Sequence, residues 1–372
     1  MQLKSNNTSV FFSLLRAGLW EREVRLADIK NIDFNEVYRI AEYQSVIGLV
    51  AAGIEHISDV KVPQAEVLQF VGTALQLEQR NQAMNKFIRR LVDQMRTANI
   101  YALLLKGQGL AQCYEKPLWR ASGDVDLFLS EENYNKAKDF LCSMASSIET
   151  EETYKKHLGL TIDGWVVELH GNLYSSLSKK IEQGLDEIYN DTFYRGNVRS
   201  WINDGRPIFQ LGYENDIIYV FTHILQHYFH GGIGLRQVCD WCRLLWTANG
   251  KYNVKLLNAK LCEMRILSEW KAFAYFAVND LCTPEDVVPF YESKKKWEYK
   301  AKHIKSFVMS SGNFGHRDMS YVKELSYLNR KFHSFKSVVN ELFRHFRAFP
   351  IDSIKFFIYY TGIRMKAVAR GE

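Results

Sequence analysis

The stretch of sequence most informative about the fold is residues 101–129, which read YALLLKGQGLAQCYEKPLWRASGDVDLFL. Residues 101–105 form a short apolar run typical of a buried strand, and residues 110–114 are expected to form a short helix. A loop with two glycines, Lys106-Gly-Gln-Gly109, joins these elements. Residues 124–129 alternate between acidic and apolar side chains and then run apolar, which predicts a second strand.

The pattern continues downstream with a helix and a β-hairpin. Residues 131–146 have one apolar face and predict an amphipathic helix. Two segments, 158–162 and 165–170, flank Asp163-Gly164, a dipeptide that supplies the positive φ angles of a tight primed turn. The sequence therefore predicts a β-α-β-α-β-β order and an α+β fold with a small mixed β-sheet.

Helical patterns precede and follow this core. Asp33 and Glu36 have capping-box spacing before an apolar-periodic run that ends near His56. The stretch from Pro63 to Asn99 predicts one long helix of about ten turns.

After residue 172 the chain is expected to be helical to its end, with breaks at 203–207 and 282–284. The first of these breaks is the expected boundary loop. We therefore expect three units, a helical N-terminal unit at 1–95, the core at 96–200, and a helical, basic C-terminal domain at 201–372.

The composition excludes several classes of protein. Hydrophobic residues make up 47% and charged residues 24% of the 372, as in ordinary globular proteins, so neither a disordered nor a membrane-embedded chain is expected. Six cysteines are too few for a disulfide framework, and the apolar run before Arg16 is too short for a secretory signal. Because no window holds the ~18 uninterrupted apolar residues of a spanning helix, we expect a reduced, cytoplasmic protein without a transmembrane segment.

Charge is unevenly distributed along the chain. Residues 293–372 hold 17 Lys and Arg against 6 Asp and Glu, a net charge of +11, whereas residues 1–292 have a net charge of −5. Residues 354–366 form a basic, aromatic-rich amphipathic stretch, most simply a solvated outer face of a helix. The alternatives are peripheral contact of the basic C-terminal helices with an anionic membrane surface or with a polyanionic acceptor. Nucleic acid is not the expected partner, because basic charge alone defines no nucleic-acid site.

Three carboxylates carry the chemistry predicted for the core. Asp124 and Asp126 are two residues apart on a strand, so their side chains project from one face. Glu168 joins them if its strand pairs with theirs. Three close carboxylates repel one another unless a divalent cation neutralises them, and oxygen ligands suit Mg²⁺. The pattern predicts a metal site, and the alternative is a pair of solvated aspartates at a strand edge.

The loop from Lys106 to Gly109 is the expected phosphate-binding element. Glycines at a strand-to-helix turn let backbone N–H groups approach a phosphate, and the start of the helix favours negative charge. Lys106 is either a phosphate contact or a solvated loop lysine. Because a GxG pattern is common at such turns, its significance depends on the acidic strand that follows.

A second cluster lies in the C-terminal domain. His223, His227 and His230 fall at i, i+4 and i+7 and share one helical face. Zinc held by the first two histidines with Cys239 and Cys242 is one interpretation, although the spacing matches no standard zinc finger. Buried, hydrogen-bonded histidines are the simpler interpretation.

A substrate-facing role is the third interpretation of this cluster. Arg236 is then the best candidate for contact with a phosphate or carboxylate, because its planar guanidinium binds bidentately. The ligand cleft is expected between the acidic face of the sheet and the helices of the second cluster. The side chains expected to face substrate are His170, His223, His227 and Asp240.

Several of these motifs together resemble a known family. Leu105-Lys-Gly107, Arg120-x-x-Gly-Asp-Val-Asp-Leu127 and Val167-Glu-Leu-His170 are similar to the uncharacterised nucleotidyltransferase-like family of the DNA polymerase beta-type nucleotidyltransferase superfamily. The superfamily signature is a glycine motif at a strand–helix turn, an Asp-hydrophobic-Asp strand and a third acidic residue on a nearby strand. The match covers about residues 100–172, and residues 41–50 are similar more loosely.

The resemblance implies metal-dependent transfer of a nucleoside monophosphate from an NTP, with pyrophosphate leaving. It implies metal-binding and catalytic roles, with Mg²⁺ or Mn²⁺ as cofactor, for Asp124, Asp126 and Glu168. The candidates for nucleotide or phosphate binding are Lys106, Gly107, Gly109, Arg120 and Arg236. Two features depart from the pattern: Lys-Gly-Gln-Gly replaces the usual Gly-Ser or Gly-Gly pair, and the 17-residue separation of Gly107 from Asp124 is long.

The expected acceptor is a hydroxyl or phosphate of a small molecule, for example a sugar. Two alternatives stay open. One is a non-catalytic binding or scaffold protein that kept the nucleotidyltransferase fold and lost the chemistry, and the other is transfer of the nucleoside monophosphate onto a protein.

Overall fold

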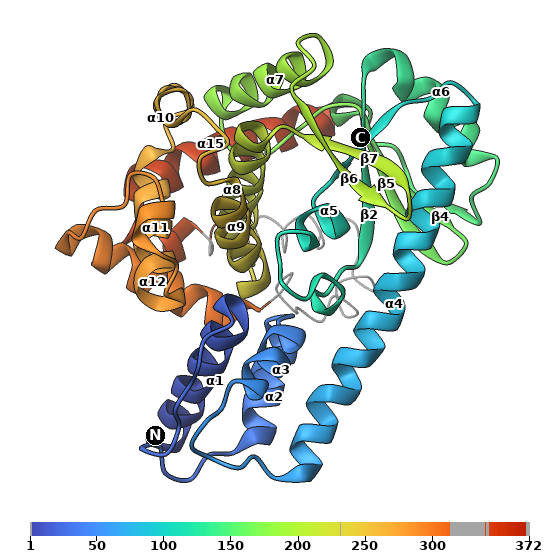
Figure 1. Ribbon diagram of the computed structural model, residues 1–372. Helices are drawn as coiled ribbons and strands as arrows, with labels where there is room; N and C mark the ends of the chain where they lie inside the picture. The colour runs from blue at the N-terminus through green and yellow to red at the C-terminus, as the bar shows by residue number, and fades with distance from the viewer. Residues whose placement is uncertain (1, 231, 313–338, 340–341, 370–372) are drawn as a thin grey trace.

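A five-stranded mixed sheet carries Asp124, Asp126 and Glu168, and helices surround it (Figure 1). The computed structural model describes residues 2–230, 232–312, 339 and 342–369. The strand order is β1-β2-β5-β4-β3, with bounds β1 Ala102–Leu105, β2 Asp124–Leu129, β3 Ser147–Ile148, β4 His157–Ile162 and β5 Trp165–His170. Helices flank this sheet, which confirms the predicted α+β class.

The pairing of β2 with β5 is parallel, whereas the other pairs in the sheet are antiparallel. In the parallel pair, Asp126 lies opposite Glu168. The β4–β5 hairpin turns at Asp163-Gly164 with φ angles of 50° and 80°, as predicted. A two-residue turn fixes the register of a hairpin, so His157 lies directly opposite His170.

The two faces of the sheet differ in character because side chains alternate along each strand. On one face, apolar side chains of β2 and β5 are buried against α4 (Gln64–Thr97) and α6 (Glu131–Cys142). On the other face, acidic side chains of the same strands look toward α8 (Tyr213–His230). The buried apolar residues on the first of these faces are Val125, Leu127, Leu129, Val167 and Leu169.

The N-terminal helices pack beside the end of α4 that lies far from the sheet (Figure 1). They are α1 Gln2–Trp20, α2 Phe34–Tyr43 and α3 Ile47–Glu55. Asp33 caps α2 as predicted, because its carboxylate accepts hydrogen bonds from the backbone N–H groups of Asn35 and Glu36 at 3.0 and 3.1 Å. The predicted run to His56 is divided in two, since α2 ends at Tyr43 and α3 begins at Ile47.

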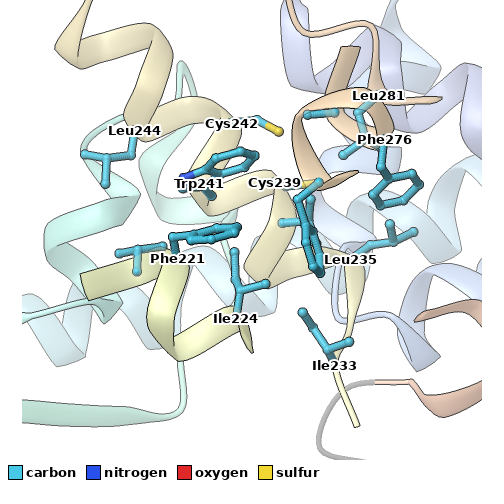
Figure 2. Close-up of a cluster of buried hydrophobic side chains, with 14 of the residues drawn as sticks. Phe221, Ile224, Ile233, Leu235, Cys239, Trp241, Cys242, Leu244, Phe276 and Leu281 are labelled. Atoms are coloured by element: carbon cyan, nitrogen blue, oxygen red, sulfur yellow. The ribbon is translucent and has the colours of Figure 1, made fainter. Parts of the chain in front are cut away.

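The helices after the sheet surround α8, whose side chains are buried almost all round. Their bounds are α7 Lys179–Phe193, α9 Leu235–Ala248, α10 Val254–Glu263, α11 Leu267–Leu281, α12 Lys295–Ser311 and α15 Pro350–Ala369. Figure 2 shows the core between α8, α9 and α11, where Phe221 meets Trp241 at 5.3 Å between ring centroids. α15 packs on α8 through Phe356, whose ring lies 4.7 Å from that of Phe229.

Residues 198–211 are not helical, which corrects the prediction for this segment. They form an antiparallel hairpin of β6 (Val198–Asn203) and β7 (Arg206–Leu211). The predicted boundary loop at 203–207 is the turn of this hairpin, and Asp204-Gly205 has φ angles of 47° and 77°. In the sequence, Pro207 suggests a loop between two helical segments, but proline is tolerated in an edge strand such as β7. Arg96 of α4 donates a hydrogen bond to the Pro207 carbonyl at 2.6 Å, which fixes the hairpin beside the core.

Two smaller differences concern the segment after β2. The helix predicted over 131–146 ends at Cys142, and the two-residue strand β3 follows it at the edge of the sheet.

None of the helices in the described ranges is both long and apolar enough to span a bilayer.

Candidate active site

The three predicted carboxylates meet on the polar face of the sheet. Asp124 and Asp126 come from β2 and Glu168 from β5, and the parallel register puts Glu168 beside Asp126. One carboxylate oxygen from each lies within 4.8 Å of the others. This all-oxygen donor set fits a hard divalent cation, and the three negative charges would be stabilised by one.

Lysine and histidine side chains contact these carboxylates. Lys106 Nζ lies 3.1 Å from Asp126 Oδ1, and His170 Nε2 lies 2.9 Å from the same oxygen. His170 Nε2 is also 3.5 Å from Glu168 Oε2, and His157 Nε2 is 3.2 Å from it. His157 is not among the residues predicted for the site, although counting outward from the Asp163-Gly164 turn places it opposite His170.

The pKa values of the carboxylates respond to these neighbours. The negative charge of Asp126, together with burial, raises the pKa of Asp124. Burial favours the neutral form of Asp126, but Lys106 and His170 outweigh it and lower the pKa of that carboxyl. Hydrogen bonds from His157 and His170 lower the pKa of Glu168. Asp126 and Glu168 are therefore held in their ionised form.

The Lys106 loop turns the lysine onto this cluster through an uncommon backbone conformation. Lys106 has φ 47° and ψ −138°, and Gly107 has φ 43°. Burial lowers the pKa of Lys106, but Asp126 and the neighbouring acids outweigh burial and raise it, so the lysine stays charged. Gly107 lines a cavity between the sheet and helix α8, whereas Gly109 packs against the side-chain amide of Gln210.

A cavity of about 210 Å³ opens between the acidic face of the sheet and helices α8 and α9, where the cleft is expected. Its wall holds the three carboxylates, Lys106 and Gly107 on the sheet side. The helix side contributes His223, His227, Arg236 and Asp240, and Arg120 lies beside them. We call this cavity the first chamber.

Arg120 and Asp240 form a buried ion pair in the wall of the first chamber. Arg120 Nε and Nη2 donate to the two carboxylate oxygens of Asp240 at 3.0 and 2.6 Å. Arg120 Nη1 donates to Ser122 Oγ at 2.6 Å, and the Tyr114 hydroxyl donates to Asp240 at 2.8 Å. The polar atoms of both side chains are thus engaged with protein groups, so the two residues position the chamber wall.

Arg236 and the two histidines complete the helix side. Arg236 Nη1 donates to the Ala121 carbonyl at 2.9 Å, and burial and Arg120 lower the pKa of its guanidinium. His223 Nε2 and His227 Nε2 lie 3.1 Å apart. Burial lowers the pKa of both imidazoles, that of His227 to about 4, so both rings are neutral near pH 7.

The zinc set suggested for this region does not form. Cys239 and Cys242 lie in the hydrophobic core with Phe276 and Leu281 (Figure 2). His230 stacks on Tyr360 of α15, with 4.5 Å between ring centroids. Of the residues that the structure describes, the groups able to hold a metal lie on the sheet instead.

A cavity of about 220 Å³, the second chamber, lies on the other side of Lys106, Glu168 and His223, which line both cavities. Its remaining wall comes from the β4–β5 hairpin and the segment before it, the segment after β5, α7 and α8. Neutral polar groups are prominent there, namely Asn172, Tyr174, Ser175, Thr222 and Gln226. Glu152 and Lys155 add charged groups, and His157 and His170 add imidazole rings.

A protein family and a solved structure are similar to this chain. A family model described as "Uncharacterised nucleotidyltransferase" matches residues 30–278, which include the sheet, both chambers and helices α8 and α9. No curated protein matches significantly. A crystal structure of an antigenic nucleotidyltransferase-like protein from Paracoccidioides brasiliensis is similar at 14% identity and a TM-score of 0.31, over 54% of this chain and 92% of that one. The family match extends over more than half of the sequence, and the chain belongs to the uncharacterised nucleotidyltransferase family.

Proposed function

We propose that this protein transfers a nucleoside monophosphate from an NTP to a hydroxyl or phosphate of a small molecule, with Mg²⁺ or Mn²⁺ held by Asp124, Asp126 and Glu168. The observation that carries the proposal is the convergence of these three carboxylates in the wall of the first chamber, where Glu168 also lines the second chamber. Family membership supports the reaction class.

The first chamber suits the triphosphate. Lys106 and Arg236 line it as cations, and Gly107 presents backbone there without a side chain. Arg120 is committed to Asp240, so we assign it to the chamber wall and not to a phosphate contact. Lys106 reaches Asp126 at 3.1 Å and would contact phosphate oxygens that approach the same carboxylates.

The second chamber suits the acceptor. Its neutral donors and acceptors match a molecule with several hydroxyl groups, and Tyr174 offers an aromatic surface. Glu168 lines both chambers, so an acceptor hydroxyl in the second chamber would lie next to an α-phosphate in the first.

The reaction forms a bond between the acceptor oxygen and the α-phosphorus and breaks the bond from that phosphorus to pyrophosphate. The acceptor proton leaves to one of the three carboxylates. A bound divalent cation would stabilise the charge on the phosphate oxygens and on the attacking oxygen. Lys106 and Arg236 would hold the triphosphate in place while the bond breaks.

A thermal-shift screen of the four NTPs with Mg²⁺ tests the nucleotide site. Binding to the native state should raise the unfolding midpoint of the wild-type protein, and Asp124→Ala with Asp126→Ala should remove the shift. Asp139→Asn is the matched control, since Asp139 is an exposed carboxylate on α6 outside both chambers. No shift with any NTP, with or without Mg²⁺, would favour the scaffold alternative.

A further inference from the structure

Two histidines converge with a carboxylate at a single point on the wall of the second chamber. His157 Nε2 and His170 Nε2 lie 3.2 and 3.5 Å from the same oxygen, Oε2 of Glu168. The two imidazole rings are 4.9 Å apart between centroids. One ligand-type atom of each of the three side chains lies within 4.8 Å of the others.

The backbone holds these side chains in register. His157 and His170 are direct cross-strand partners in the β4–β5 hairpin, and Glu168 precedes His170 by two residues on the same face. The hairpin is closed by a two-residue turn and continues into the five-stranded sheet. The three side chains therefore project from strands, which position ligands more precisely than loops do.

We propose that His157, Glu168 and His170 bind a first-row divalent transition ion such as Zn²⁺ or Co²⁺, at a position distinct from the all-carboxylate set. Imidazole nitrogen suits such ions, whereas Mg²⁺ prefers oxygen ligands. Two nitrogens and one oxygen leave coordination positions open toward the second chamber. The site does not depend on nucleotidyl transfer, although Glu168 belongs to both donor sets.

The alternative is that the histidines only hold Glu168 in place by hydrogen bonds. Elsewhere in the molecule, His56 Nε2 lies 2.7 Å from Glu21 Oε2 in a simple imidazole–carboxylate pair. That pair provides a matched control for the effect of removing one histidine from such a contact.

Titration of the full-length protein with Co²⁺, followed by visible absorption, tests the site. We expect absorption bands that saturate near one equivalent, disappear with stoichiometric Zn²⁺ and persist in excess Mg²⁺. His157→Gln should weaken Co²⁺ binding by about tenfold or more, and His56→Gln should not change it. Asp124→Asn removes a ligand from the carboxylate set without replacing either histidine, so it should keep the spectrum.

Two results would overturn the proposal. One is the absence of Co²⁺ absorption in the wild-type protein, or equal affinity in His157→Gln. The other is loss of the spectrum in Asp124→Asn with retention in His157→Gln, which would put the ion in the carboxylate set. The readout is metal binding without nucleotide, so its failure is distinguishable from failure of the proposed reaction.

Discussion

Replacing Asp240 with alanine should destabilise the folded protein by about 3–5 kcal/mol. Asp240 is 3% exposed and Arg120 is 7% exposed. The substitution removes two hydrogen bonds from Arg120, at 3.0 and 2.6 Å, and one from Tyr114 at 2.8 Å. Arg120 would keep its bond to Ser122 but lose its counter-charge in a site that water reaches poorly.

The size of this effect comes from the charge left behind more than from the bonds lost. A buried charge whose partner is removed costs more than the pair contributes. Arg236 adds to the cost, because Arg120 already lowers the pKa of Arg236 while Asp240 acts in the opposite direction. Without Asp240, the repulsion between the two guanidinium groups would no longer be offset.

Urea unfolding followed by circular dichroism and by tryptophan fluorescence measures this effect, provided that the two transitions coincide. The double variant Arg120→Met, Asp240→Leu should lose less stability than Asp240→Ala, because it removes the charge together with its partner. Glu132→Ala breaks an exposed ion pair with Lys136 and should leave the midpoint unchanged.

A loss below about 1 kcal/mol in Asp240→Ala would refute the reasoning, since that is the range of exposed pairs. It would mean that Arg120 is well solvated and free to bind a phosphate. The sequence-based assignment of Arg120 to nucleotide binding would then be preferred.

Three further predictions concern other parts of the molecule. Burial raises the pKa of Glu182 from 4.5 to about 7, against hydrogen bonds from Ser175 that favour the ionised form. Below pH 4.5 the carboxyl is protonated in both the folded and the unfolded state. As the pH rises from there to about 7, the free energy of unfolding of the wild-type protein should fall by roughly 3 kcal/mol relative to that of Glu182→Gln. Above pH 7 the difference should stay level. A pH-independent difference in urea unfolding would contradict this. Gly18→Ala should cost about 1–3 kcal/mol, because the added Cβ would meet the α3 backbone at Leu49; an unchanged thermal midpoint would argue against such close packing. If the basic segment 293–372 contacts an anionic membrane surface, the full-length protein should bind anionic lipid vesicles in cosedimentation and release them at high salt. No binding would favour the solvated helix face, and equal binding to neutral vesicles would exclude an electrostatic origin.

Local periodicity was sufficient to predict the strands that build the site. The alternation in Asp124–Leu129 puts two carboxylates on one face, and Asp163-Gly164 defines the hairpin that carries Glu168. The same hairpin register contains His157, so this residue was accessible from the sequence through the geometry of the turn.

Contacts between distant segments were not accessible in the same way. Arg120 and Asp240 are 120 residues apart, and their pairing depends on how α9 packs beside the loop before β2. The GxG pattern also makes Gly107 and Gly109 equal candidates for phosphate binding. In the structure, however, Gly109 packs against Gln210 of the β6–β7 hairpin, and only Gly107 lines the first chamber. That hairpin was itself missed, because Pro207 looks like a break when the edge position of its strand is unknown.

The most direct test of the proposed reaction is pyrophosphate release and transfer of an α-phosphate label. The wild-type protein would be incubated with α-labelled NTPs, Mg²⁺ and a pool of small-molecule acceptors. The account predicts a labelled product and pyrophosphate in equal amounts from the wild-type protein and neither from Asp124→Ala with Asp126→Ala, at unchanged circular dichroism. Equal product from that variant would contradict the assignment of the carboxylates.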